Sequence, residues 1–203
     1  MQYPTHDASK FLQIDLPSFP NDSATVFLLD PDSNIIDKFS YDEDMHFDLI
    51  SNTEGVSLEK INPSLPSSDL FNWHSASESI GWGTPGLTNS QYFNSGNNQE
   101  FLAVLTPVFS PDNDGYQDVA QFSYLLNGSG MVGNAVIYDN KGRIIKKILT
   151  NELLSTEGSL TWDGTMDNGE KARVGIYMIY FETFTLSGEV RAEKKTVTLL
   201  TQF

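Results

Sequence analysis

The chain has 203 residues, of which 39% are hydrophobic and 12% aromatic, so it can form one large domain or two small ones with cores of their own. Its formal net charge of -15 at pH 7 disfavours binding to nucleic acid or to anionic lipid surfaces. The absence of cysteine excludes disulfides, thiolate zinc sites, iron–sulfur clusters and cysteine nucleophiles.

The first half of the chain predicts short strands separated by turns. Residues 24–29 form an apolar run that stops at Asp-Pro-Asp-Ser-Asn, residues 30–34, and residues 35–41 return as a second strand. We expect these two strands to make a hairpin. Residues 56–61 alternate between apolar and polar side chains, which predicts a strand with one face exposed to water.

Residues 62–89 are rich in Pro, Ser, Asn and Gly and predict a long irregular segment that contains Trp73 and Trp82. In one interpretation the two indoles are buried and pin this segment to the sheet. In the other, Trp73, His74 and Trp82 form a binding surface on which a sugar or a protein ligand stacks.

The second half predicts about seven strands within a hundred residues, at a spacing typical of a β-sandwich. The polar stretch at 93–99 predicts a linker between a first module at 1–92 and a second module at 100–203. The expected strands of the second module are residues 101–105, 119–126, 133–139, 143–148, 159–163, 175–185 and 191–200.

The first module carries a set of motif residues at 55–61, 72–76 and 81–89, including a Gly-Thr-Pro-Gly closure at 83–86. In these residues it resembles the closing part of a bacterial lamin-tail domain. The opening strands of that domain are not recognisable before Asp15. The resemblance implies an immunoglobulin-like β-sandwich, whole or partial, of the kind found on exported proteins.

The second module carries an ordered set of motif residues at 109–118, 136–139, 142–143, 162–165, 168–169 and 175–177. In these residues it resembles immunoglobulin-like C-terminal modules of Bacteroidetes surface proteins, of the flagellar hook-capping and gliding-motility-associated types. This resemblance implies a module that can serve as a C-terminal sorting signal for type IX secretion, although near relatives sit on proteins exported by other routes. Together the two resemblances predict an all-β protein built from tandem immunoglobulin-like β-sandwiches.

Three carboxylates, Asp112, Asp114 and Asp118, surround Gly115 in a single loop and are a candidate calcium site. The loop does not fit the EF-hand pattern, because with Gly115 at the sixth position the twelfth is Gln121 and no bidentate carboxylate closes the site. The alternative is a turn in which the aspartates accept hydrogen bonds from the backbone.

The three histidines, His6, His46 and His74, have no metal-binding spacing, so a zinc site is not expected. His46 follows Asp42, Glu43 and Asp44, and by charge attraction we expect a raised pKa for it.

The start of the chain has no signal peptide and no apolar run approaches the ~20 residues that span a bilayer. Given the two resemblances, we expect a fragment of an exported, extracellular or cell-surface protein with no membrane insertion. Its expected partners are upstream domains of the same polypeptide, secretion or surface machinery, and a glycan or protein ligand.

We find no nucleophile elbow, phosphate-binding loop or dinucleotide fingerprint in the sequence, and therefore expect no enzymatic activity. The predicted function is structural: anchoring or displaying a larger exported protein, with calcium as the one possible cofactor. Two alternatives stay open, namely an adhesin that uses the Trp73–Trp82 loop and a fragment of a calcium-dependent hydrolase.

Overall fold

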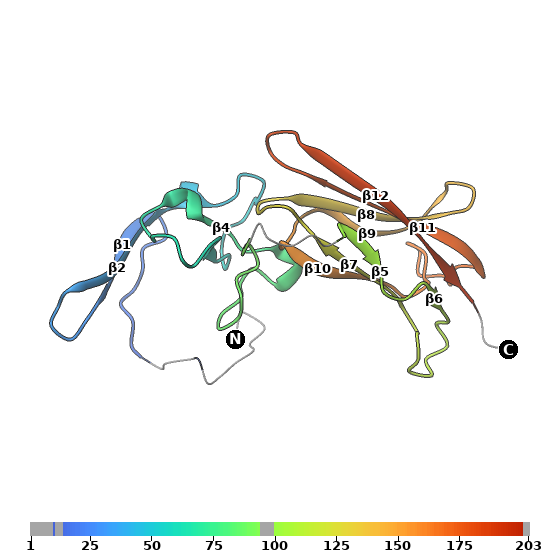
Figure 1. The fold of residues 1–203 in the computed structure, drawn as a ribbon, viewed down its shortest axis with the longest axis horizontal. Coiled ribbons are helices and arrows are strands. Elements are labelled where there is room, and N and C mark those ends of the chain that lie inside the picture. Colours follow the sequence, from blue (N-terminus) through green and yellow to red (C-terminus); the bar gives the residue numbers. More distant parts are fainter. Residues whose placement is uncertain (1–9, 11–13, 94–99, 201–203) are drawn as a thin grey trace. The chain divides into compact units, whose positions relative to one another are not determined.

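The computed structural model describes residues 10, 14–93 and 100–200, and apart from short 3-10 turns its regular structure is β (Figure 1). The predicted all-β class is confirmed. The chain divides into two compact units, the first made of residues 1–95 and 128–130 and the second of 96–127 and 131–203. The linker predicted at 93–99 lies, except for Phe93, outside the described residues. Within the described part of the chain, no helix is long and apolar enough to cross a membrane.

The first unit begins with the predicted hairpin, in which β1 (Ser23–Leu29) pairs with β2 (Ile35–Asp42) in antiparallel register. The Asp30 carboxylate closes the turn by accepting hydrogen bonds from the backbone N–H groups of Asp32 and Asn34, at 2.9 and 2.7 Å. The side-chain amide of Asn34 also donates to Asp30, and these bonds hold the pKa of Asp30 below its usual value.

A second two-stranded sheet of this unit consists of β3 (Leu58–Lys60) and β4 (Trp73–Ser75), again antiparallel. Two 3-10 turns, η2 (Glu43–Met45) and η3 (Leu70–Asn72), lie between the described strands, and a third, η4 (Glu78–Ile80), follows β4. The segment predicted to be irregular therefore contains one short strand that the sequence did not reveal. Glu59 in β3 is buried, so the prediction of one wet face is wrong at this residue.

The second unit is a β-sandwich of eight strands. Its three-stranded sheet has the order β10-β7-β5 and its five-stranded sheet the order β6-β12-β11-β8-β9. All pairs are antiparallel except β6 with β12, which is parallel. The strands are β5 (Leu102–Val104), β6 (Val108–Phe109), β7 (Ala120–Leu125), β8 (Val132–Asp139), β9 (Ile144–Leu153), β10 (Glu157–Trp162), β11 (Gly175–Phe184) and β12 (Val190–Leu199).

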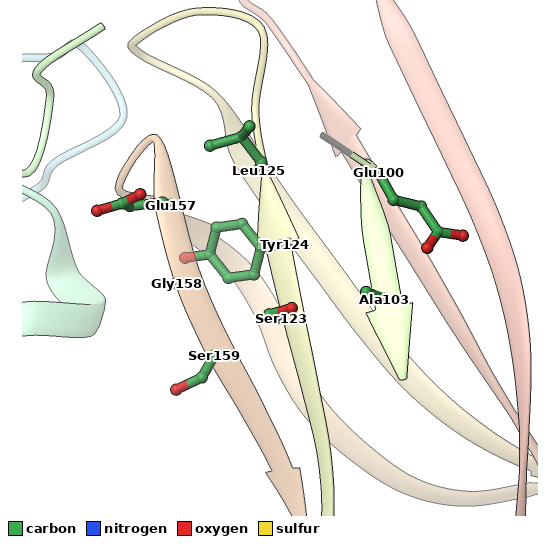
Figure 2. Close-up of a pocket in the computed structure, with 8 residues that line it drawn as sticks. All are labelled: Glu100, Ala103, Ser123, Tyr124, Leu125, Glu157, Gly158 and Ser159. Carbon is green, nitrogen blue, oxygen red and sulfur yellow. The ribbon is translucent and has the colours of Figure 1, made fainter. Parts of the chain in front are cut away.

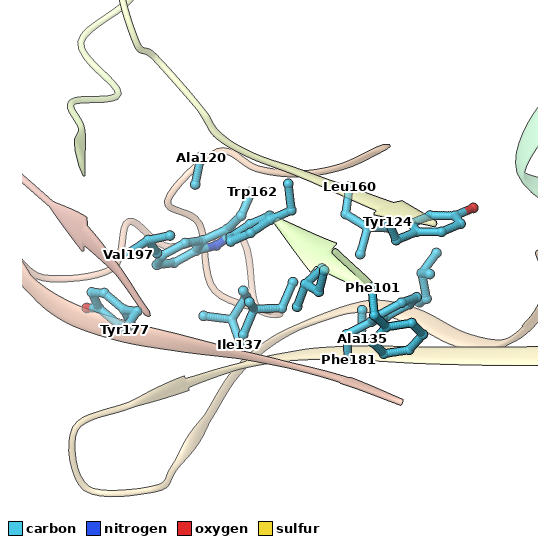
Figure 3. Close-up of a cluster of buried hydrophobic side chains, with 14 of the residues drawn as sticks. Phe101, Ala120, Tyr124, Ala135, Ile137, Leu160, Trp162, Tyr177, Phe181 and Val197 are labelled. Carbon is cyan, nitrogen blue, oxygen red and sulfur yellow. The ribbon is translucent and has the colours of Figure 1, made fainter. Parts of the chain in front are cut away.

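Between the two sheets lies an apolar core to which both contribute (Figure 3). Trp162 is 1% exposed and its ring meets those of Phe109 and Tyr177 edge-on, at centroid distances of 5.3 and 4.8 Å. Phe181 packs against Phe101 and Tyr124 at 5.2 Å. Along the strands, inward-facing aromatic and aliphatic side chains alternate with outward-facing polar ones. The alternation seen in the sequence therefore places the apolar side chains between the two sheets of the sandwich.

Candidate functional site

The acidic loop lies in the second unit between β6 and β7. One carboxylate oxygen from each of Asp112, Asp114 and Asp118 lies within 4.8 Å of the other two, so the fold brings together the three aspartates that the sequence singled out. Asp112 and Asp114 are exposed and Asp118 is half-buried. Their carboxylates are the hard oxygen ligands that calcium prefers.

Each of these carboxylates also holds the loop in shape. Asp118 accepts hydrogen bonds from the backbone N–H groups of Asn113 and Gly115, at 2.7 and 2.9 Å. Asp114 accepts one from Tyr116 at 2.7 Å, and Asp112 accepts one from the N–H of Asp114 at 3.2 Å. The backbone is left-handed at Asn113 and Gly115, with φ of 65° and 88°, so the loop turns back on itself here.

Calcium would need further ligands beyond these three aspartates, because it takes six to eight oxygens. Backbone carbonyls and water would have to supply them. The oxygens of Asp118 already accept one amide each, so a cation would have to use their remaining lone pairs. The geometry is therefore compatible with a weak cation site and is also sufficient for a turn without one.

In the first unit, Trp73 packs against strand β2 and so holds the β1–β2 hairpin in place. Its ring stacks on Phe39 of β2 with a centroid distance of 3.8 Å and an interplanar angle of 21°. Its Nε1–H donates to the carbonyl of Ser67 at 3.0 Å, and Lys60 Nζ lies 5.9 Å from the ring centroid. One face of the indole is thus covered by Phe39, and the polar atom of the indole is satisfied.

His74 and His46 both lie near Ser75 of β4. His74 Nδ1 is 3.0 Å from the carbonyl oxygen of Ser75, and His46 Nδ1 is 3.0 Å from the Ser75 hydroxyl. Burial lowers the pKa of both histidines below the ordinary 6.5, because it disfavours the charged imidazolium. The expected rise in the pKa of His46 is therefore wrong, because partial burial of the ring lowers it instead.

Trp82, the third predicted binding residue, is half-buried and has a left-handed backbone with φ of 67°. Its N–H donates to the carbonyl of Ser77 at 3.0 Å, and its carbonyl accepts from Ser57 at 2.9 Å. Non-glycine residues seldom adopt this conformation, so these two bonds help to hold the turn that precedes the Gly-Thr-Pro-Gly closure.

Sequence reasoning missed Glu59, the one buried side chain with a formal charge among the described residues. It is 5% exposed, and its carboxylate accepts hydrogen bonds from both the backbone N–H and the hydroxyl of Thr84 and of Ser90. The Asn89 side chain adds a bond to the carbonyl of Lys60 at 3.0 Å. Thr84 belongs to the Gly-Thr-Pro-Gly closure and Asn89 to the same matching stretch, residues 81–89, so this stretch binds the loop to β3.

Two of the grooves formed by described residues belong to the second unit. The first, of about 580 Å³, contains the carboxylates of Glu100 and Glu157 (Figure 2). Glu100 forms an ion pair with Lys195. The lining residues of this groove are Glu100, Ala103, Ser123, Tyr124, Leu125, Glu157, Gly158 and Ser159. The second groove, of about 510 Å³, contains Asp139 and Arg143, which are paired at 2.7 Å, and Tyr177, whose hydroxyl donates to the carbonyl of Arg173.

No model of a protein family matches the chain, and no curated protein matches it. Among solved structures it is similar to FlgD from P. aeruginosa, with 19% identity and a TM-score of 0.35 over 49% of this chain and 69% of that one. It is also similar to dimeric latent PorU from Porphyromonas gingivalis, with 15% identity and a TM-score of 0.38, over 92% of this chain and 13% of that one.

A third similar structure is PorZ from the same organism, described as a surface component of its type-IX secretion system. The identity is 14% and the TM-score 0.37, over 86% of this chain and 20% of that one. The chain therefore spans only a small part of PorU and PorZ. The lamin-tail resemblance of the first half stays a prediction.

Proposed function

We propose that this chain is a non-catalytic structural module that anchors or displays a larger exported protein at the cell surface. The observation that carries the proposal is that the side chains best suited to chemistry hold the fold instead. Asp118 binds two loop amides, Glu59 binds four donors, and Trp73 is stacked and hydrogen bonded. Polar groups committed to the backbone fix loops rather than turn over a substrate.

The architecture of the second unit supports this function. A sandwich with a fully buried aromatic core is stiff and folds around its own apolar residues, while its surface loops stay free to vary. Such a module can hold an attached domain in place without catalysing a reaction. Its expected partners are upstream domains of the same polypeptide and the machinery that exports or retains them.

The proposal is tested by fusing the chain to an exported reporter enzyme in a bacterium with a type IX secretion system. Protease accessibility on intact cells then reports surface display. We expect surface display to require the folded chain. Trp162→Ala leaves a cavity in the core and should abolish display. Thr161→Ala, at the exposed neighbouring residue, should leave display intact. A reporter that reaches the same place without the chain contradicts the proposal.

A hydrolytic role is tested on the purified chain with ester, phosphate and glycoside substrates, with and without calcium. We expect no turnover above that of buffer. Turnover that follows the protein through purification and disappears in Asp114→Asn would replace the structural function with the hydrolase alternative. The adhesin alternative is disfavoured by the cover that Phe39 places on one face of Trp73.

A second candidate function is calcium binding by the acidic loop, favoured by the convergence of three carboxylates within 4.8 Å. A ligand bound only by the native state raises the melting temperature by mass action. Calcium at millimolar concentration is therefore expected to raise the Tm, EDTA to reverse the rise, and Asp114→Asn to remove it. Magnesium is the control cation, and no shift in the wild-type chain would leave the loop a purely structural turn.

A further inference from the structure

The outer edge of β1 has no partner strand within the described part of the chain. β1 pairs with β2 alone, and the two form a separate two-stranded sheet (Figure 1). β2 is the strand tied to the body of the first unit, through the stacking of Phe39 on Trp73 and a 2.5 Å bond from the Ser67 hydroxyl to Asp37. Among the described residues, the backbone N–H and C=O groups on the far side of β1 therefore have no partner strand, and such an edge can pair with another strand.

The chemistry of β1 suits strand addition. Its seven residues, Ser-Ala-Thr-Val-Phe-Leu-Leu, include no charge and no proline. Val26, Phe27 and Leu28 are 36%, 50% and 58% exposed, so apolar side chains on both faces of the hairpin lie open. The one irregularity in pairing falls between Leu28 and Leu29, next to the turn, which leaves the rest of the strand regular.

Three of the four edge strands of the second unit, β5, β6 and β9, carry protection that β1 lacks, and the fourth, β10, includes a charged residue, Glu157. β9 is interrupted by three register shifts against β8 and carries Lys146 and Lys147. Asp167 covers part of the edge of β9, because its N–H donates to the carbonyl of Ile145 and its carboxylate accepts from the N–H of Lys147. β5 and β6 are only three and two residues long. Bulges, lysines and short length are the devices that keep edges from pairing.

We infer that the edge of β1 is a self-association site, which pairs in antiparallel fashion with β1 of a second copy to give a four-stranded sheet. This goes beyond the proposed function and does not depend on it. A strand edge is self-complementary about a two-fold axis, so one uncharged strand can serve both copies. A two-stranded sheet is marginal alone, and two further strands would cover edge groups and apolar side chains at once.

The absence of charged residues in β1 favours this edge as the place where a second copy of the chain binds. Two chains of charge -15 repel one another, and β1 is a stretch where no like charges come face to face. Asp22 and Asp30 flank the strand and would approach their counterparts at its two ends. Added salt screens such repulsion, so the association strengthens as ionic strength rises. A basic partner segment attracted by the same aspartates would behave in the opposite way.

The test is sedimentation velocity of the full chain over a range of concentrations, at low and moderate salt. We expect a monomer–dimer equilibrium that salt strengthens. Phe27→Glu and Leu28→Glu should each weaken it about tenfold or more, because they place a charge in the strand pair. Ile176→Glu, on an equally exposed apolar residue of β11, is the matched control and should leave the equilibrium unchanged.

Hydrogen exchange locates the contact. Amides of β1 should gain protection as the concentration rises, in the wild type and in Ile176→Glu but not in Phe27→Glu. Circular dichroism checks that each variant is folded. A chain that stays monomeric at millimolar concentration overturns the inference, and so does a dimer that survives both β1 variants or is lost in Ile176→Glu. A monomer that takes up a foreign strand at β1 also overturns it.

Discussion

Glu59 carries a full set of donors around both of its carboxylate oxygens. Thr84 and Ser90 supply two donors each, and they tie the closing segment of the first unit to β3. The Ser90 hydroxyl also accepts from the N–H of Ser77 at 3.0 Å, which draws the segment after β4 into the same network. A buried carboxylate with this many neutral donors needs no cation beside it.

Replacing Glu59 with glutamine should destabilise the first unit. The amide keeps the size of the side chain but turns one acceptor oxygen into a donor, which leaves the buried donors of Thr84 or Ser90 unmatched. The expected loss is about 1–3 kcal/mol in the free energy of unfolding. Chemical denaturation followed by tryptophan fluorescence measures it, with the exposed Glu54→Gln as control. Equal stability of the two variants would mean that water replaces the lost acceptor.

The two half-buried histidines predict a pH dependence of the first unit. Their pKa values are lowered from 6.5, so below that pH the unfolded chain binds more protons than the folded one. Unfolding free energy should therefore fall as the pH drops from about 7 to about 5, and His74→Gln should remove part of that fall. Carboxylates of lowered pKa, such as Asp30 and Asp37, lose their contribution only at lower pH. A parallel pH profile in wild type and variant would contradict this assignment.

At the scale of strands, Gly133 in β8 is required by packing. A Cβ at this position would lie 2.4 Å from Leu154 Cδ1, whereas one at Gly175 in β11 would meet nothing within 4 Å. Neither glycine has a left-handed φ, so space is the difference between them. Gly133→Ala should cost the second unit about 1–3 kcal/mol through overpacking, and Gly175→Ala should cost little. Thermal unfolding of the two variants tests this prediction. A lower Tm for Gly175→Ala than for Gly133→Ala would contradict it.

The longer strands of the second unit could be predicted because they combine period-two alternation with a turn signal at their ends. The turn at Asn140–Lys141–Gly142 is an example: Asp139 accepts hydrogen bonds from the N–H groups of Lys141 and Arg143. β6 was not predicted, since two residues are too few to show a period. The sequence therefore predicts a strand only where the strand is long enough for its alternation of apolar and polar residues to be visible.

The network of Glu59 could not be predicted for a different reason. Its donors lie 25 and 31 residues away along the chain, and an acid in an alternating strand favours the solvent face. The carboxylates of Asp112, Asp114 and Asp118 lie close together in the structure, as their closeness in sequence suggests, and calcium binding by this loop stays a prediction. Which oxygens a cation could still use depends on loop geometry, and no pattern of residue types reports that.

At the scale of the whole chain, 27 acidic residues face 12 basic ones. Ion pairs among the described residues are few, and Asp139–Arg143, Glu100–Lys195 and Glu193–Lys195 are the examples. Self-repulsion should therefore outweigh surface attraction, and the Tm should rise between low and physiological salt as the repulsion is screened. Melting in sodium chloride, with an equal ionic strength of sodium acetate as control, measures this. A Tm that falls with salt would show that ion pairs dominate.

The place of β12 in its sheet has a consequence for timing. β12 is the last described strand in the chain, yet it lies between β6 and β11 and joins them. While a ribosome is still making the second unit, β11 has one open side and β6 has nothing to pair with. The sandwich can close only when its final segment has been made. A chain that stops before β12 therefore lacks the strand that joins β6 to β11, and its five-stranded sheet stays incomplete.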